Sequence, residues 1–251
     1  MLVAIARIPE DPQARTRAAA ATGLALADIN RRLAGTLPRV LFPAIPEDRG
    51  REMTAALQQL GFQVLTCDLA AVPGDEDRVV ARKVELAADA FVATDARGEP
   101  HRCPGTAIAL LQRGVKVTRT AGRAASTEKK FSVSKAILSG GLMMTTKVKK
   151  DATADVETAE PFLLVSRVDG QPDVVFHERR IDYRSMGADK QPSSRANLER
   201  LWARLVEMAP RGAVDDRVAR PGFVSGLPSS SVDATDLALY LVALSRRAGG
   251  L

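Results

Sequence analysis

Short apolar runs and longer helical patterns alternate over the N-terminal part of the chain. Three apolar runs predict buried strands, and they cover Leu2–Ile8, Arg39–Ile45 and Phe62–Cys67. Between them, apolar residues recur at helical spacing over residues 12–34 and 47–60. A glycine follows each helical pattern, Gly35 or Gly61, as is typical of a helix C-terminus. The order β-α-β-α-β predicts a small α/β sandwich over residues 1–71, with its helices on one face.

The pattern changes after the acidic, turn-rich stretch Val72–Asp77, which predicts a domain boundary. Short strand patterns follow at residues 79–86, 90–94, 115–120, 162–168 and 174–177. An apolar segment over residues 106–112 is expected to stop at Gly114, and Asp169-Gly170 is a strong hairpin signal. We therefore expect a strand-rich second domain over residues 78–251.

Two amphipathic helices are predicted in that domain. Ser193 or Ser194 is a suitable N-cap for a helix near residues 194–209, whose apolar residues form one stripe. A last helix is predicted near residues 233–247. Strands followed by an amphipathic helix is the order of a pleckstrin-homology-like domain, an analogy of fold only. The predicted fold class is therefore α+β.

The N-terminal part also carries an ordered set of motifs. These are Ala21-Thr-Gly-Leu-Ala-Leu-Ala-Asp28, a Gly-Thr-Leu-Pro turn, and a helix that ends Leu-Gln-Gln-Leu-Gly-Phe-Gln-Val64. This part, about residues 1–70, resembles the C-terminal domain of the bacterial ribosomal stalk protein L7/L12, whose general fold the adaptor ClpS shares. The resemblance implies a fold and a protein-docking face. It does not imply binding of translation factors, because Ala27 and Asn30 replace lysines of that family. The remainder resembles bacterial proteins of unknown function, which implies no activity.

The positive charge of the chain is concentrated in one segment. Residues 115–150 hold nine Lys or Arg residues and one acid, Glu128, a local charge of +8. The whole chain carries +6, so the rest carries −2. The segment is predicted to be a hairpin that turns at Gly140–Gly141. Its candidate polyanion-binding residues are Lys129, Lys130, Lys135, Lys147, Lys149 and Lys150.

Two interpretations of these lysines remain open. They could neutralise the phosphates of nucleic acid or of an anionic lipid surface. They could instead protect the edge of a strand from aggregation, which is a common use of lysine. Phe131 is the one aromatic residue of residues 115–150, so base stacking is poorly supplied.

A metal site is a further alternative, because two thiols and two imidazoles are the ligand types of tetrahedral zinc. The candidate ligands are Cys67, Cys103, His101 and His177. Their spacing lacks the close Cys or His pairs that usual zinc sites have. The structural alternative is that Cys67 is a buried strand residue and His101 a turn residue. An undetected metal-dependent hydrolase is therefore kept as a second alternative function.

No other enzyme signature is present. Gly222-Phe-Val-Ser225-Gly226 differs from the G-x-S-x-G elbow of hydrolases, and the sequence contains no phosphate-binding glycine loop. The sequence predicts a cytoplasmic, non-enzymatic binding or adaptor protein that docks another protein. No cofactor and no catalytic residue are expected. No apolar run approaches the roughly 20 residues of a transmembrane helix.

Overall fold

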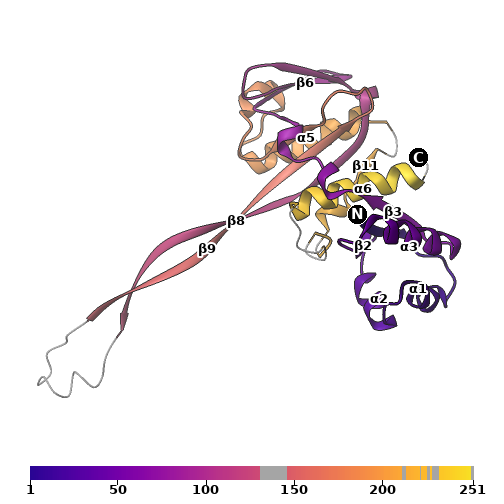
Figure 1. Cartoon of the computed structure of the whole chain (residues 1–251). Helices are drawn as coiled ribbons and strands as arrows, with labels where there is room; N and C mark the ends of the chain where they lie inside the picture. The colour runs from indigo at the N-terminus through magenta and orange to yellow at the C-terminus, as the bar shows by residue number, and fades with distance from the viewer. Residues whose placement is uncertain (131–145, 211–212, 221, 225–226, 228–231, 250–251) are drawn as a thin grey trace, which may run out of the picture. The chain divides into compact units, whose positions relative to one another are not determined.

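The computed structural model describes residues 1–130, 146–210, 213–220, 222–224, 227 and 232–249 (Figure 1). Within residues 119–157 the description covers the backbone. The described chain combines helices with several β-sheets, which confirms the predicted α+β class. It forms two compact units, one of Met1–Lys116 with Glu160–Leu251 and one of Val117–Ala159. No helix in the described part is both long and apolar enough to cross a bilayer.

The N-terminal part folds as the predicted alternation of strands and helices. Its antiparallel sheet has the order β2-β1-β3, formed by β1 (Leu2–Arg7), β2 (Arg39–Phe42) and β3 (Gln63–Cys67). Its helices are α1 (Ala14–Thr22), α2 (Leu26–Arg32) and α3 (Glu47–Gln59). Ile5 and Leu41 of the sheet are buried in one cluster with Ile29 and Leu57 of the helices. The helices therefore cover one face of this sheet.

The helical pattern over residues 12–34 is two helices and not one, which corrects the prediction. Gly23 ends α1 with φ +70, in the left-handed region that glycine adopts without a steric penalty. The chain then re-enters a helix at Leu26. The periodicity of apolar residues predicted one helical segment because the apolar positions of α1 and α2 have similar spacing.

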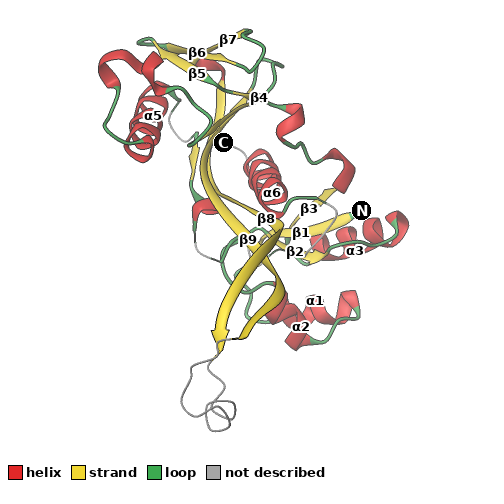
Figure 2. Cartoon of the chain, turned by 90° about the vertical axis from the view of Figure 1, so that its left-hand side faces the viewer, coloured by secondary structure: helices red, strands yellow, loops and turns green. Residues whose placement is uncertain are grey.

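The opposite face of the same sheet is also buried. Leu2 and Leu65 belong to a cluster with Val175 and with Leu237 and Leu241 of the last helix, α6 (Ala234–Gly249). Figure 2 shows α6 beside the N-terminal strands. The compact unit therefore spans the stretch 72–77, at which a domain boundary was predicted. Independent folding of residues 1–71 stays a prediction, which limited proteolysis tests.

A five-stranded sheet follows in the described chain, with the order β11-β8-β9-β10-β4. Its strands are β4 (Val79–Val80), β8 (Ile108–Lys130), β9 (Thr146–Arg167), β10 (Val174–His177) and β11 (Val214–Asp215). β10 is antiparallel to β9 and parallel to β4. The predicted hairpin between β9 and β10 is confirmed, and Gly170 has the φ of +76 that such a turn requires.

A smaller antiparallel sheet and a helix complete the fold. The sheet consists of β5 (Lys83–Leu86), β6 (Ala90–Thr94) and β7 (Pro100–Pro104). The strand pattern predicted at 90–94 is β6, whereas the single pattern predicted at 79–86 is two strands, β4 and β5. Helix α5 (Ser194–Met208) begins where expected, because the Ser193 hydroxyl accepts a hydrogen bond from the Ala196 N–H at 3.2 Å. Short 3-10 helices cover Leu69–Ala71, Asp75–Asp77, Gly105–Ala107, Tyr183–Asp189 and Arg217–Ala219. The core beneath α5 includes Phe91 and Phe176.

Candidate functional site

The predicted basic segment lies mainly on two neighbouring strands. Residues 117–159 form a compact unit of their own, in which β8 and β9 are adjacent and make a two-stranded ribbon. Lys129 and Lys130 are the last residues of β8. Lys147, Lys149 and Lys150 lie near the beginning of β9, which starts at Thr146. Figure 1 shows the end of β8 and the beginning of β9 at the same end of the ribbon.

The strands of this ribbon are longer than predicted. The separate strand patterns at 115–120 and 162–168 are parts of the continuous strands β8 and β9, and Gly114 does not stop the apolar segment before it. A Cβ at Gly114 would lie 2.9 Å from the Phe162 ring and 3.1 Å from Val218. The side chains of Phe162 and Val218 therefore pack closely against the backbone at Gly114. Lys135 and the predicted turn at Gly140–Gly141 lie outside the described residues.

A buried ionic network lies within the first unit. We define this network as Asp75, Arg78, Lys116, Glu160, His177, Arg180 and Asp236. Arg78 and Asp236 form its most buried pair, with 2.5 Å between Nη1 and Oδ1 and side chains 3% and 6% exposed. Lys116 Nζ lies 3.2 Å from Asp236 and 3.5 Å from Asp75. Asp236 therefore holds two cations beside the first turn of α6.

His177 is the most enclosed member of the ionic network, with a side chain 1% exposed. Its Nε2 lies 3.0 Å from Asp75 Oδ2. Its Nδ1 lies 3.9 Å from Glu160 Oε2, and no hydrogen-bond partner for Nδ1 occurs in the described chain. Arg180 reaches both carboxylates, at 3.8 Å from Asp75 and 3.5 Å from Glu160. The histidine is thus enclosed by two acids that share one arginine.

The ionic network shifts the proton affinities of its members. The hydrogen bond from His177 is the largest cause that lowers the pKa of Asp75, and it outweighs the opposing effect of burial. Burial by itself lowers the pKa of Lys116, but Asp236 and Asp75 together raise it above its ordinary value. Both groups are therefore charged at neutral pH. Three carboxylates face three permanent cations around one imidazole, which is the composition of a structural ion cluster.

Asp75 should make the protein sensitive to acid. Its folded-state pKa is lowered, so its stabilising effect is present above the unfolded pKa of about 3.9 and is lost as pH falls through the lowered value. We expect Asp75→Asn to reduce the unfolding free energy at pH 7 by on the order of 2 kcal/mol, and much less near pH 2. Urea unfolding at several pH values measures this. The exposed Asp48→Asn is the control, and equal effects at both pH values would contradict the assignment.

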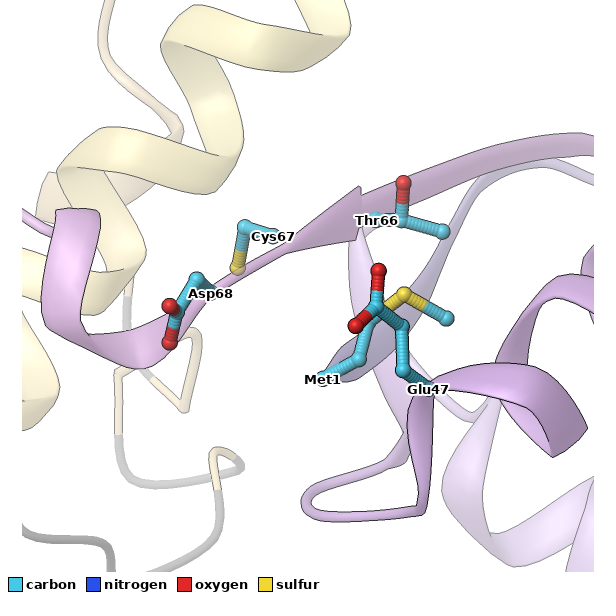
Figure 3. A pocket seen from close by; sticks show the side chains of 5 residues that line it. All are labelled: Met1, Glu47, Thr66, Cys67 and Asp68. Carbon is cyan, nitrogen blue, oxygen red and sulfur yellow. The ribbon is translucent and has the colours of Figure 1, made fainter.

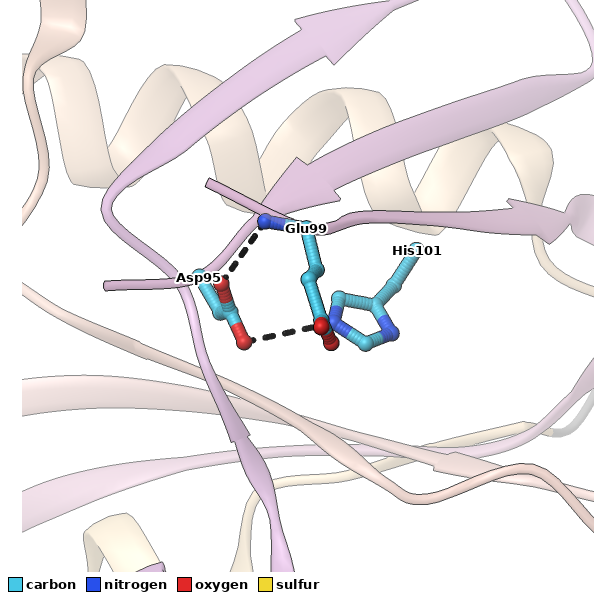
Figure 4. Close-up of side chains that lie close together, drawn as sticks. All are labelled: Asp95, Glu99 and His101. Carbon is cyan, nitrogen blue, oxygen red and sulfur yellow. Dashed lines mark hydrogen bonds and ion pairs between the residues drawn. The ribbon is translucent and has the colours of Figure 1, made fainter. Parts of the chain in front are cut away.

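The four candidate zinc ligands do not meet. Cys103 belongs to the cluster beneath α5, whereas Cys67 belongs to the cluster around α6. Burial raises the pKa of Cys67 to about 11 and also raises that of Cys103, so both remain protonated thiols. His177 lies beside Asp75. His101 instead lies beside two carboxylates, Asp95 and Glu99, in the turn between β6 and β7 (Figure 4).

A pocket of about 310 Å³ lies elsewhere, beside the end of β3 and the start of α3 (Figure 3). Its lining includes the carboxylates of Glu47 and Asp68 and the side chains of Met1, Thr66 and Cys67. The N-terminal ammonium of Met1 donates a hydrogen bond to the Ile45 carbonyl at 3.1 Å. The pocket thus combines two acids with a thiol whose pKa is raised, chiefly by burial and also by Asp68, which makes the thiol a poor nucleophile at neutral pH.

Sequence reasoning missed the ionic network and the carboxylate partners of His101. Asp75 was explained as part of the turn-rich stretch Val72–Asp77, and His101 was considered only as a zinc ligand together with thiols. Ser225 of the imperfect hydrolase motif lies outside the described residues.

No family model matches the chain, and no curated protein or solved structure matches it either.

Proposed function

We propose that this chain is a non-enzymatic binding protein and that the β8–β9 ribbon is its contact surface for duplex nucleic acid. The observation that carries the proposal is the placement of lysines on both strands of one two-stranded unit. Because the remainder of the chain outside residues 115–150 is net negative, this ribbon is its most basic element. Phosphate neutralisation by lysine would provide the affinity.

The shape of the ribbon supports a duplex in preference to a single strand. The major groove of B-DNA admits a two-stranded β-ribbon as well as an α-helix. Single-strand binding usually depends on stacked aromatic residues, and residues 115–150 contain only Phe131. The apolar runs at 136–138 and 142–144 are the sequence feature that supports the alternative, a membrane surface. Binding to vesicles is therefore measured beside binding to the duplex.

The salt dependence of binding tests the proposal. The lysine pairs Lys129–Lys130 and Lys149–Lys150 supply about four phosphate contacts, so log K against log salt should have a slope near −4. We expect the double change Lys129→Glu and Lys130→Glu to reduce the magnitude of this slope by about two. Fluorescence anisotropy with a labelled duplex of mixed sequence, across a salt series, measures both values.

The control carries the same charge change in the first unit, at the exposed residues Lys83 and Lys190. It should leave the slope unchanged. Undetectable duplex binding at low salt, or an equal loss in the control, would contradict the proposal. Binding to phosphatidylserine vesicles without duplex binding would assign the ribbon to lipid. Docking of a protein partner through residues 1–70 stays a proposal from the family resemblance, which affinity capture with the whole chain tests.

A further inference from the structure

We infer that the turn between β6 and β7 is a binding site for a divalent transition-metal ion of the zinc class, with Asp95, Glu99 and His101 as its ligands. One ligand atom from each of the three side chains lies within 4.8 Å of the others. Figure 4 shows all three side chains directed to the same side of the turn. This site is independent of the ribbon and of the function proposed for it.

The distance between the first two ligand atoms fits a shared metal. His101 Nε2 and Asp95 Oδ2 are 3.6 Å apart, which is too long for a good hydrogen bond. Two ligands at about 2.1 Å from zinc in tetrahedral geometry are about 3.4 Å apart. The observed pair therefore needs almost no adjustment, and the exposed side chain of Glu99 can complete the set by rotation.

The turn holds these groups in place before any ion binds. Asp95 Oδ1 accepts hydrogen bonds from the N–H groups of Arg97 and Glu99, at 2.8 and 2.9 Å. This orientation leaves Oδ2 directed at the imidazole. The ladder between β6 and β7 pairs Ala93 with His101 and so fixes the position of the ring. The pre-organised carboxylate lowers the entropic cost of binding.

His101 provides a separate indication of a ligand. Its Nε2 is inaccessible to solvent and has no hydrogen-bond partner in the described part of the chain. A polar atom in that condition costs free energy unless a partner or an ion satisfies it. The His101 side chain as a whole is 26% exposed, and the neighbouring Glu99 is exposed to solvent.

The chemistry of the ligands selects the kind of ion. One imidazole nitrogen with carboxylate oxygens suits zinc and its neighbours, whereas calcium and magnesium prefer oxygen ligands alone. Three protein ligands leave a position for water or for a further ligand. The sequence suggested zinc with thiol partners for His101. The structure places two carboxylates beside it in their stead, those of Asp95 and Glu99, which precede His101 by six and two residues.

The test is titration of the full-length, tag-free chain with zinc chloride, followed by calorimetry. We expect saturable binding of one ion, and no saturable binding of calcium chloride under the same conditions. Asp95→Asn, Glu99→Gln and His101→Gln should each weaken zinc binding by at least ~10-fold. Asp95→Asn keeps an oxygen that can accept the two turn hydrogen bonds, so it removes a ligand charge while it preserves the turn.

Glu85→Gln is the matched control, because Glu85 is an exposed glutamate on the adjacent strand β5. It should leave zinc affinity unchanged. The chain has two histidines, so an imidazole ¹⁵N spectrum resolves His101 from the buried His177. Zinc should shift the His101 signals and leave those of His177 in place. Absence of saturable binding, an unmoved His101, or equal effects of Glu85→Gln and Glu99→Gln would overturn the site and leave only a contact between Asp95 and His101.

Discussion

Replacing Asp236 with alanine should reduce the free energy of unfolding by about 3–5 kcal/mol. Asp236 is 6% exposed and faces both Arg78 and Lys116. Removing its carboxylate leaves these cations without their closest anion, in surroundings where water reaches Arg78 poorly. An unpaired buried charge costs far more than the intact pair contributes, because the desolvation penalty remains.

Urea unfolding, followed by circular dichroism, measures this effect. Asp216→Ala is the control, since Asp216 pairs with Arg220 at the surface and both side chains are about half exposed. A surface pair contributes at most about 1 kcal/mol. Asp236→Asn should fall between the two, because the amide still accepts a hydrogen bond from Arg78 and lacks the charge. If Asp236→Ala were as stable as the control, the ionic network would not stabilise the fold.

Replacing Phe176 with alanine should also reduce the unfolding free energy by about 3–5 kcal/mol. Phe176 is fully buried on β10 and packs edge-to-face against Phe91, with 5.7 Å between ring centroids. The substitution removes apolar contacts and leaves a cavity between the five-stranded sheet and the smaller sheet. The cost follows from both the lost burial and the empty volume.

Two further variants make this measurement specific to burial. Phe176→Leu keeps most of the volume and should lose clearly less stability than Phe176→Ala. Val168→Ala alters a residue that is 69% exposed and should change stability by less than about 0.5 kcal/mol. Thermal unfolding of the three variants beside the wild type orders them. Similar losses for Phe176→Ala and Val168→Ala would contradict the assigned core.

Local patterns in the sequence determined most individual elements, because their causes lie within a few residues. Short apolar runs predicted the three N-terminal strands, and further strand patterns predicted β6 and β10. The Ser193 cap and the Asp169-Gly170 turn each depend on backbone geometry that neighbouring residues decide. The helix end at Gly23 was missed because the apolar residues on either side of it keep helical spacing, although Gly23 itself has a left-handed conformation. The α+β class followed from the order of these elements.

The tertiary structure alone decided which side chains meet. His177 and Asp75 are 102 residues apart, and Arg78 and Asp236 are 158 residues apart. No short-range pattern encodes such a pairing, because the pairing results from sheet order and from the packing of α6. The continuation of β8 past Gly114 is also a tertiary effect. At Gly114 the missing side chain leaves space for Phe162 of the neighbouring strand β9. His101 lies beside a carboxylate because the register of β6 and β7 places Asp95 next to it. The thiols of Cys67 and Cys103 are buried in two different hydrophobic clusters.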